Sequence, residues 1–302
     1  MKNILITGGT GLVGQRLTQL LLEKGYVVRY LSRSAGTTTQ GIQKYKWDLK
    51  NQTIDQEAIA WADAIINLAG ANVGEGRWTK KRKKELYDSR IDSVNLLHDY
   101  IKAAPNYKNK VFISASAIGL YGFGTIDEQF TEQSKPANDF LATLTKDWEV
   151  AMDKVASLGI RTAKLRVGVV LSNEGGALPK IAKPIKLFAG AALGSGKQLL
   201  SWIHIDDLCR LFIAALENES YQGAYNAVAP NPVSNKEFTV SVAKILKKPL
   251  FLPPVPAFML NLLLGEMASI ATRGSYVDCQ KVIQQGFEYE YSDHQEALKD
   301  LL

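Results

Sequence analysis

The sequence of 302 residues contains few of the features that mark metal-binding or secreted proteins. Its two cysteines, Cys209 and Cys279, are far apart and lack metal-type spacing, so neither a disulfide framework nor a zinc site is predicted. No secretory signal precedes the first predicted strand, and the scarcity of cysteine suits a reducing compartment. We therefore predict no metal site and a cytoplasmic location.

Long apolar runs and a strong charge of one sign are also lacking. The most apolar late stretch, residues 258–264, is broken by Asn261 and is too short to cross a bilayer, so it is interpreted as a buried or substrate-lining helix. The formal charge of +6 suits anionic ligands but does not argue for nucleic acid. The basic run 80–84 has no interleaved aromatic platform, which favours a solvated helix face. We predict neither a membrane nor a nucleic-acid partner.

The sequence does contain a glycine-rich turn after an apolar run. Residues 4–6 are typical of a buried strand, and glycines then follow as Gly8-x-x-Gly11-x-x-Gly14, overlapped by Gly9-x-Gly11-x-x-Gly14. Such glycines allow a tight turn, let the backbone approach a pyrophosphate, and let a helix pack closely on a strand. The helix that follows would point its free N–H groups at the phosphates. The pattern predicts a dinucleotide-binding site.

The rest of the chain alternates between predicted strands and helices. After the first helix, which Gly25 ends, strands are expected at 26–31, 42–47, 62–67, 110–114 and 161–171, and long helices at 80–104 and 139–157. This alternation predicts an α/β fold, a doubly wound parallel sheet of the Rossmann type. Residues 1–171 would form the nucleotide-binding domain, with about 199–228 returning to the sheet. The loop-rich and proline-rich remainder, 172–302, would mainly bind substrate.

The end of the second strand bears on the choice of cofactor. A protein that prefers NAD usually has an acidic residue there, which binds the ribose 2′-hydroxyl. This chain has Ser32, Arg33 and Ser34 instead. A guanidinium offers a bidentate fork that suits a 2′-phosphate, so we predict NADP(H); the alternative is a surface arginine without a ligand.

Several segments together resemble the NAD-dependent epimerase/dehydratase family of the extended short-chain dehydrogenase/reductase superfamily. They are residues 7–14, 67–70, 114–122 and 202–207, supported by 139–142, 147–149, 231–235, 253–266 and 286–287. The likeness covers nearly the whole chain and points to the atypical branch labelled only "epimerase family protein". Its members are related to sugar-nucleotide epimerases.

The resemblance implies a role for individual residues at the cofactor. The pyrophosphate would be surrounded by Gly8, Thr10, Gly11, Leu12, Val13 and Gly14. Arg33 would hold the adenosine phosphate, and Asp48 would lie near the adenine. Leu68, Ala69 and Gly70 would pass behind the ribose and nicotinamide, and Arg90 would point back toward the cofactor.

The same resemblance indicates where the catalytic groups should be. Ser116 occupies the strand-end position of the family's catalytic serine or threonine. The superfamily's acid–base pair, a tyrosine and a lysine four residues apart on the next helix, is replaced by Leu141 and Thr145, and Lys146 is one residue off. Tyr121 could substitute for the missing tyrosine; the alternative is a structural tyrosine of the Tyr-Gly turn.

Two classes of function follow from these predictions. The first is an NADP(H)-dependent oxidoreductase or epimerase-like enzyme that acts on a small carbonyl or hydroxyl substrate, with Ser116 orienting it and Tyr121 or a water handling the proton. The second is a redox sensor or regulatory protein that binds NADP(H) without turnover. A homodimer formed through the helices at 80–104 and 139–157 is expected at the level of the family.

Overall fold

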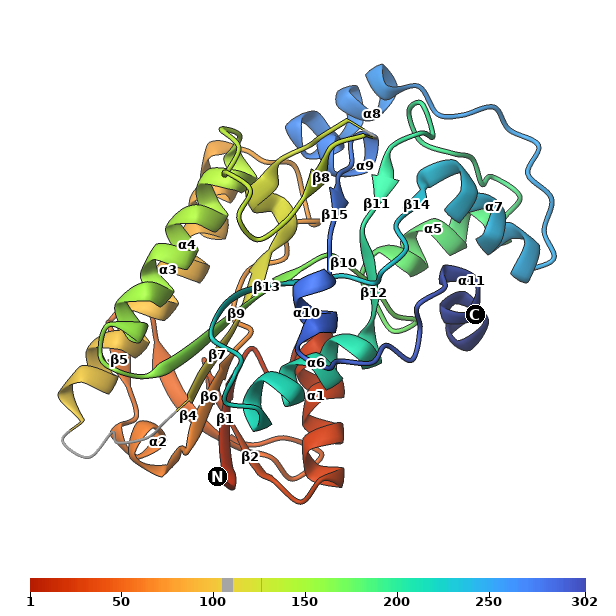
Figure 1. Ribbon diagram of the computed structural model, residues 1–302. Coiled ribbons are helices and arrows are strands. Elements are labelled where there is room, and N and C mark those ends of the chain that lie inside the picture. The colour runs from red at the N-terminus through yellow and green to blue at the C-terminus, as the bar shows by residue number, and fades with distance from the viewer. Residues whose placement is uncertain (105–110, 126) are drawn as a thin grey trace.

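The computed structural model describes residues 1–104, 111–125 and 127–302, and its centre is a nine-stranded sheet covered by helices on both faces (Figure 1). Its parallel strands follow the order β13 (Gly223–Ala227), β9 (Arg161–Val167), β7 (Val111–Ala117), β6 (Ala64–Asn67), β1 (Asn3–Thr7), β2 (Val27–Ser32) and β4 (Gln43–Asp48). Two short strands, β3 (Gly36–Thr37) and β5 (Thr53–Ile54), pair antiparallel with β4. The predicted doubly wound sheet is confirmed.

Alternation of side chains along the strands builds a core on each face of the sheet. In β1, Ile4 and Ile6 belong to one core and Leu5 to the other, as the period of two in a strand requires. The first core is covered by α1 (Leu12–Glu23) and α6 (Ile205–Glu217). The second is covered by α2 (Gln56–Trp61), α3 (Lys80–Ala103) and α4 (Phe140–Ala156). Figure 1 shows α3 and α4 side by side on their face of the sheet.

The C-terminal part has a smaller core of its own. Helices α5 (Ala177–Lys186), α7 (Asn235–Ile245) and α11 (His294–Leu301) pack around it. Its strands pair as β10 (Val169–Leu171) with β12 (Trp202–His204), and as β11 (Leu199–Leu200) with β14 (Val233–Ser234). The other elements are η1 (Ile118–Tyr121), β8 (Gln129–Phe130), α8 (Ala257–Leu264), η2 (Gly265–Ala268), α9 (Ser269–Thr272), β15 (Tyr276–Val277) and α10 (Gln280–Gln284).

The sixth predicted strand, 161–171, is two strands separated at Gly168. The N–H of Gly168 donates to the Ala227 carbonyl, whereas the next N–H, that of Val169, donates to Ser201. A Cβ on Gly168 would lie 2.5 Å from the Ser201 carbonyl oxygen, so only glycine allows this exchange of partners. The segment predicted to return to the sheet does so through β13, while β12 pairs with β10 outside the large sheet.

Two other predictions have different outcomes. The helix expected at 258–264, either buried or lining a substrate site, is α8. It is not buried, because Leu260 is its one buried residue and Phe258 and Leu262 are 71% and 76% exposed. Its residues Ala257 and Asn261 line a pocket. The basic run at the start of α3 is mostly solvated, as predicted, and forms ion pairs, such as Lys84 with Asp88 at 2.6 Å.

Lys110, the expected first residue of the fifth strand, lies outside the described residues. Among the helices described, none has the length and apolar character needed to cross a membrane.

Candidate active site

A buried chain of polar side chains crosses three neighbouring strands, β1, β6 and β7, at the level where β1 and β6 end. Thr7 Oγ1, at the end of β1, donates to Asn67 Oδ1 at 2.7 Å, and Asn67 Nδ2 donates to Ser114 Oγ at 2.9 Å. Thr7 Oγ1 also accepts from the N–H groups of Leu68 and Ala69, each at 3.2 Å. These bonds satisfy groups that burial would otherwise leave unpaired. They hold residues 68–70 beside the glycine turn at the carboxyl edge of the sheet, where ligands bind in such folds.

The glycine turn leaves no room for side chains on the side that faces the sheet. Gly8 has a φ of +68°, and a Cβ on it would lie 2.7 Å from the Leu68 carbonyl oxygen. A Cβ on Gly14 would lie 2.5 Å from the Gly8 carbonyl oxygen, so helix α1 packs directly on the turn. Gly11 caps α1 without any side-chain hydrogen bond, whereas Thr79 and Asp139 cap α3 and α4 with theirs. The first N–H groups of α1 therefore have no side-chain cap, which suits a pyrophosphate.

The residues predicted at the adenosine end lie at the ends of β2 and β4. Arg33 is exposed and makes no ion pair within the described parts of the chain. Ser34, the next residue, has its hydroxyl 3.4 Å from Lys44 Nζ. The Asp48 carboxylate accepts from the N–H of Asn51 and its side-chain amide, and from the N–H of Lys50. These bonds, with that from the Asn51 N–H foremost, lower the pKa of Asp48. The Asp48 side chain thus closes the turn formed by residues 48–51.

A cleft of about 390 Å³ brings six of the predicted site residues together. It opens where the first turn of α1, the end of β6, the middle of α3 and the end of β7 meet. The predicted residues on its wall are Val13, Leu68, Ala69, Gly70, Arg90 and Ser116. Thr10, Gly11 and Leu12 lie on the glycine turn just beyond it. The residues predicted at the nicotinamide end therefore share a single cleft in the structure.

Arg90 gives this cleft a positive charge. Its guanidinium lies 5.2 Å from the ring centre of Trp148 and donates to the Leu86 carbonyl at 3.1 Å. A Cβ on Gly70 would lie 3.0 Å from it, so the two residues are in close contact. Burial, with the nearby charge of Arg82, lowers the pKa of Arg90 to about 10. No carboxylate of the described ranges pairs with Arg90, which leaves it available to a ligand.

Ser116 is held by a buried carboxylate. Its hydroxyl donates to Glu149 Oε1 at 2.6 Å, and Arg166 donates to both oxygens of Glu149, at 2.8 and 2.9 Å. Burial opposes ionisation of Glu149, but the hydrogen bonds and charges of Arg166, Ser116 and Lys164 outweigh it and hold the pKa of Glu149 below its ordinary value. Because the Ser116 proton is engaged, the hydroxyl offers the cleft an acceptor rather than a donor.

Tyr121 does not line the cleft. Its hydroxyl donates to Asn226 Oδ1 at 2.6 Å and accepts from Arg166 at 2.8 Å, and its ring stacks on Phe130. The side chain is 2% exposed, and burial raises the pKa of the phenol to about 12. This is the position of a structural tyrosine, so the structure lends no support to proton transfer by Tyr121.

The wall contributed by α4 carries the two residues predicted to replace the acid–base pair. Leu141 and Thr145 both line the cleft, and a Cβ on Gly119 would lie 3.3 Å from Leu141 Cβ. The Thr145 hydroxyl donates to the Leu141 carbonyl at 2.8 Å. Lys146 is exposed and is absent from the cleft wall. The sequence reasoning placed these three side chains correctly on the helix.

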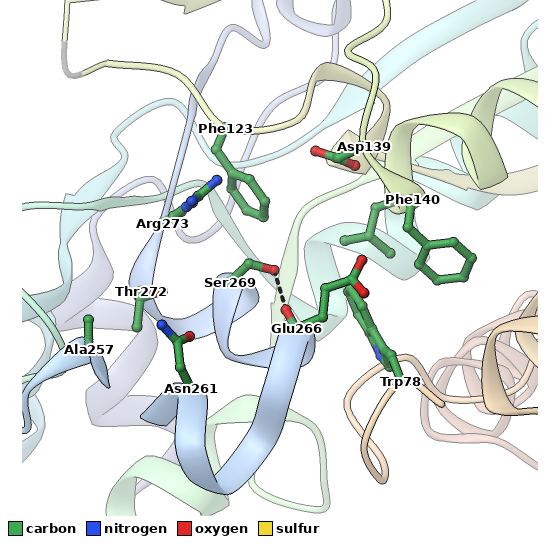
Figure 2. Close-up of a pocket in the computed structure, with 11 residues that line it drawn as sticks. Trp78, Phe123, Asp139, Phe140, Ala257, Asn261, Glu266, Ser269, Thr272 and Arg273 are labelled. Carbon is green, nitrogen blue, oxygen red and sulfur yellow. Dashed lines mark hydrogen bonds between the residues drawn. The ribbon is translucent and has the colours of Figure 1, made fainter. Parts of the chain in front are cut away.

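Three residues that sequence reasoning missed enlarge the site. A second pocket of about 460 Å³ adjoins the cleft, and Phe123 and Arg273 border both, while Trp78 lines the outer one (Figure 2). These residues come from three distant segments, and none belongs to a motif. No local pattern in the sequence signals them, because they are brought together only by the tertiary fold.

Comparison with known proteins identifies the family. A model of the "NAD dependent epimerase/dehydratase family" matches residues 4–227, well over half of the chain. The chain belongs to this epimerase/dehydratase family. A second model, "Domain of unknown function (DUF1731)", matches residues 255–301. The recognition made from the sequence is thereby confirmed.

Relatives of this epimerase/dehydratase chain match it over its whole length. The "epimerase family protein YfhF" of Bacillus subtilis is 39% identical over 99% of this chain and 98% of its own. A chloroplastic homologue of SDR39U1 from Arabidopsis thaliana is 37% identical, over 99% of this chain and 86% of its own. Among solved structures, human epimerase family protein SDR39U1, crystallised with NADPH, has a TM-score of 0.87 and 30% identity, covering 99% of this chain and 98% of the human one.

Proposed function

We propose that this protein is an NADP(H)-dependent oxidoreductase of the short-chain dehydrogenase/reductase type that acts on a small carbonyl or hydroxyl substrate. The observation that carries the proposal is the cleft where Leu68, Gly70 and Ser116 meet the first turn of α1. Residues 1–171 would hold the cofactor, and 172–302 would mainly hold the substrate.

The glycine turn and Arg33 support the choice of NADP(H). The turn has the backbone approach and the free N–H groups that a pyrophosphate requires, so the residues present fit the cofactor. Exposed Arg33 and nearby Lys44 suit a 2′-phosphate. The human relative was crystallised with NADPH, which agrees with this choice.

The proposed roles at the reacting end follow from hydrogen-bonding capacity. A bound nicotinamide supplies or accepts the hydride. Ser116, with its own proton committed to Glu149, accepts a hydrogen bond from the substrate hydroxyl and so orients it. Arg90 stabilises negative charge that develops on the substrate oxygen. Since Leu141 and Thr145 stand where the tyrosine and lysine belong, a water carries the proton.

The test is spectroscopic and uses the full-length protein. NADPH and NADH are titrated separately, and oxidation of bound NADPH is followed across aldehydes, ketones and nucleotide sugars. We expect NADPH to bind more tightly than NADH and at least one carbonyl compound to be reduced, with a lower kcat in Ser116→Ala. Preference for NADH, or a kcat unchanged by Ser116→Ala, would contradict the proposal.

The alternative is a sensor that binds NADP(H) without turnover. The apolar wall at Leu141 and Thr145 favours it, because no side chain there can exchange a proton with a substrate. The expected result for a sensor is tight NADPH binding with no oxidation by any compound of the panel. A change in proteolytic susceptibility between the NADPH-bound and NADP⁺-bound protein would support this alternative directly.

A homodimer through α3 and α4 and a cytosolic setting remain part of the proposal. Val150, 51% exposed on α4, is the large apolar side chain that this face presents to solvent. Size-exclusion chromatography should show a dimer for the native protein and a monomer for Val150→Glu. The matched variant Leu262→Glu, on exposed α8, should remain dimeric. If the native protein elutes as a monomer, the proposed dimer is rejected.

A further inference from the structure

The outer pocket has aromatic walls that come from separate segments of the chain. Trp78 follows β6, Phe123 follows η1 and Phe140 begins α4 (Figure 2). Trp78 and Phe140 meet edge to face with ring centres 5.3 Å apart. Flat apolar surfaces of this kind favour a planar ring as a ligand, because ring faces and edges attract one another.

Arg273 stands where the outer pocket meets the inner cleft. It lines both, and also a third hollow beside Gly124 and Lys197. Its guanidinium lies 5.8 Å from the ring centre of Phe123, and Figure 2 shows the two side chains next to each other at one rim. The side chain is exposed and forms no ion pair in the parts of the chain that the structure describes. A ligand anion therefore has a free bidentate partner at this junction.

The charges of the outer pocket limit how much negative charge a ligand can bring. Besides Arg273, the pocket has two carboxylates, Asp139 and Glu266. Asp139 accepts the N–H of Ala142 at the start of α4, and Glu266 pairs with Lys83 at 2.6 Å, so both carboxylates are held in place. A diphosphate would gain one guanidinium but would face both carboxylates, because like charges repel. A ligand with a single negative charge avoids that repulsion.

We propose that the outer pocket binds a planar aromatic ring and that Arg273 binds a single carboxylate of the same molecule. The reacting carbonyl or hydroxyl then extends past Leu141 into the inner cleft, since Phe123, Leu141 and Arg273 border both spaces. The substrate class is thus an aromatic oxo or hydroxy acid rather than a nucleotide sugar. That the ligand reacts rests on the proposed function; that it binds does not.

Calorimetry with three probes tests the proposal on the NADPH-loaded, full-length protein. Phenylpyruvate has the ring, the carbonyl and the carboxylate; phenylacetone lacks the carboxylate; UDP-glucose brings a diphosphate. We expect phenylpyruvate to bind at least tenfold more tightly than either of the others. In Arg273→Ala, the affinity for phenylpyruvate should fall at least tenfold, while the affinity for phenylacetone should change less than twofold. Arg273→Lys should recover part of the loss.

Two controls separate a site from a general effect of charge. Lys146→Ala removes an exposed cation of α4 outside the pocket and should leave all three affinities unchanged. Phe140→Leu should lower the affinity for phenylpyruvate and for phenylacetone by the same factor, because it removes a ring contact and leaves Arg273 unchanged. The proposal is overturned if UDP-glucose binds more tightly than phenylpyruvate, if phenylpyruvate does not bind, or if Arg273→Ala weakens both phenyl compounds equally.

Following NADPH absorbance in the same samples distinguishes this inference from the proposed function. Binding of phenylpyruvate with the expected dependence on Arg273 but without NADPH oxidation would retain the site and reject the enzyme. Oxidation with nucleotide sugars, and no binding of phenylpyruvate, would retain the enzyme and reject the site.

Discussion

The two ends of the cleft are built in opposite ways. The proposed cofactor end consists mainly of backbone: the turn from Gly8 to Gly14 and the strand end at residues 68–70, which touch because Gly8 has no side chain. The proposed substrate end consists of side chains, Trp78, Phe123 and Arg273, from distant segments. A site made of backbone tolerates no added atom, whereas a site made of side chains can change specificity by substitution while the fold is kept.

The largest expected effect is at the cofactor end. In Gly14→Ala the new Cβ would lie 2.5 Å from the Gly8 carbonyl oxygen and 2.6 Å from Gly9 Cα, and no flexible side chain can yield. We expect NADPH binding to be lost and stability to fall by about 1–3 kcal/mol, the usual cost of overpacking. The measurements are an NADPH fluorescence titration and chemical denaturation.

Gly11→Ala is the matched control for this prediction. Its Cβ would meet only the Gly8 carbonyl oxygen, at 3.2 Å, so the free energy of unfolding should fall much less than in Gly14→Ala. Equal losses of stability in the two variants would show that the turn is not defined by close packing.

Arg33→Ala should have the next largest effect and tests whether any side chain matters at the cofactor end. Loss of a charge-assisted hydrogen bond costs about 1.5–3 kcal/mol, so NADPH affinity should fall roughly 10- to 100-fold. NADH affinity should stay the same, because NADH lacks the 2′-phosphate. Parallel titrations with both cofactors measure this, and unchanged NADPH affinity would reject the assignment of Arg33.

The Tyr121→Phe variant tests whether the Tyr121 hydroxyl takes part in the chemistry. The variant leaves Asn226 and Arg166 without the hydroxyl that each now contacts, so we expect a loss of stability of about 1–2 kcal/mol. The kcat for NADPH oxidation should remain within about twofold, because the hydroxyl lies outside the cleft. A large fall in kcat with unchanged stability would instead make Tyr121 catalytic.

The smallest expected effect is a dependence of stability on alkaline pH. Burial raises the pKa of Tyr121 to about 12, so the unfolded chain loses this proton first, near its ordinary pKa of about 10. The stability that the folded protein gains by keeping Tyr121 protonated is therefore complete below pH 10 and is lost as pH rises toward 12. At pH 10.5 the free energy of unfolding should already have fallen by about 1 kcal/mol. Denaturation curves at pH 8 and 10.5 should show that loss in the native protein beyond the loss in Tyr121→Phe.

The fold was predictable because its signals are local. The apolar runs of β1, β6 and β7 and the helical spacing in α1 and α3 each lie within one element, and each was placed to within a few residues. Prediction failed where partners from elsewhere decide the conformation. The strand over 161–171 breaks at Gly168 because Ala227 and Ser201 supply different hydrogen-bond acceptors. Helix α8 was expected to be buried or to line a substrate site because its sequence is apolar, and tertiary packing buries only Leu260 of it.

For the site, the same division holds. The spacing of the glycines and the position of Arg33 after a strand predicted the dinucleotide end, since backbone approach and charge are encoded in consecutive residues. The sequence alone also predicted that Leu141 and Thr145 replace the usual pair. Only the tertiary structure decided that the Ser116 proton is taken by Glu149 and that Tyr121 is enclosed. The junction of Phe123 and Arg273 likewise depends on contacts between residues 150 positions apart, which no local pattern records.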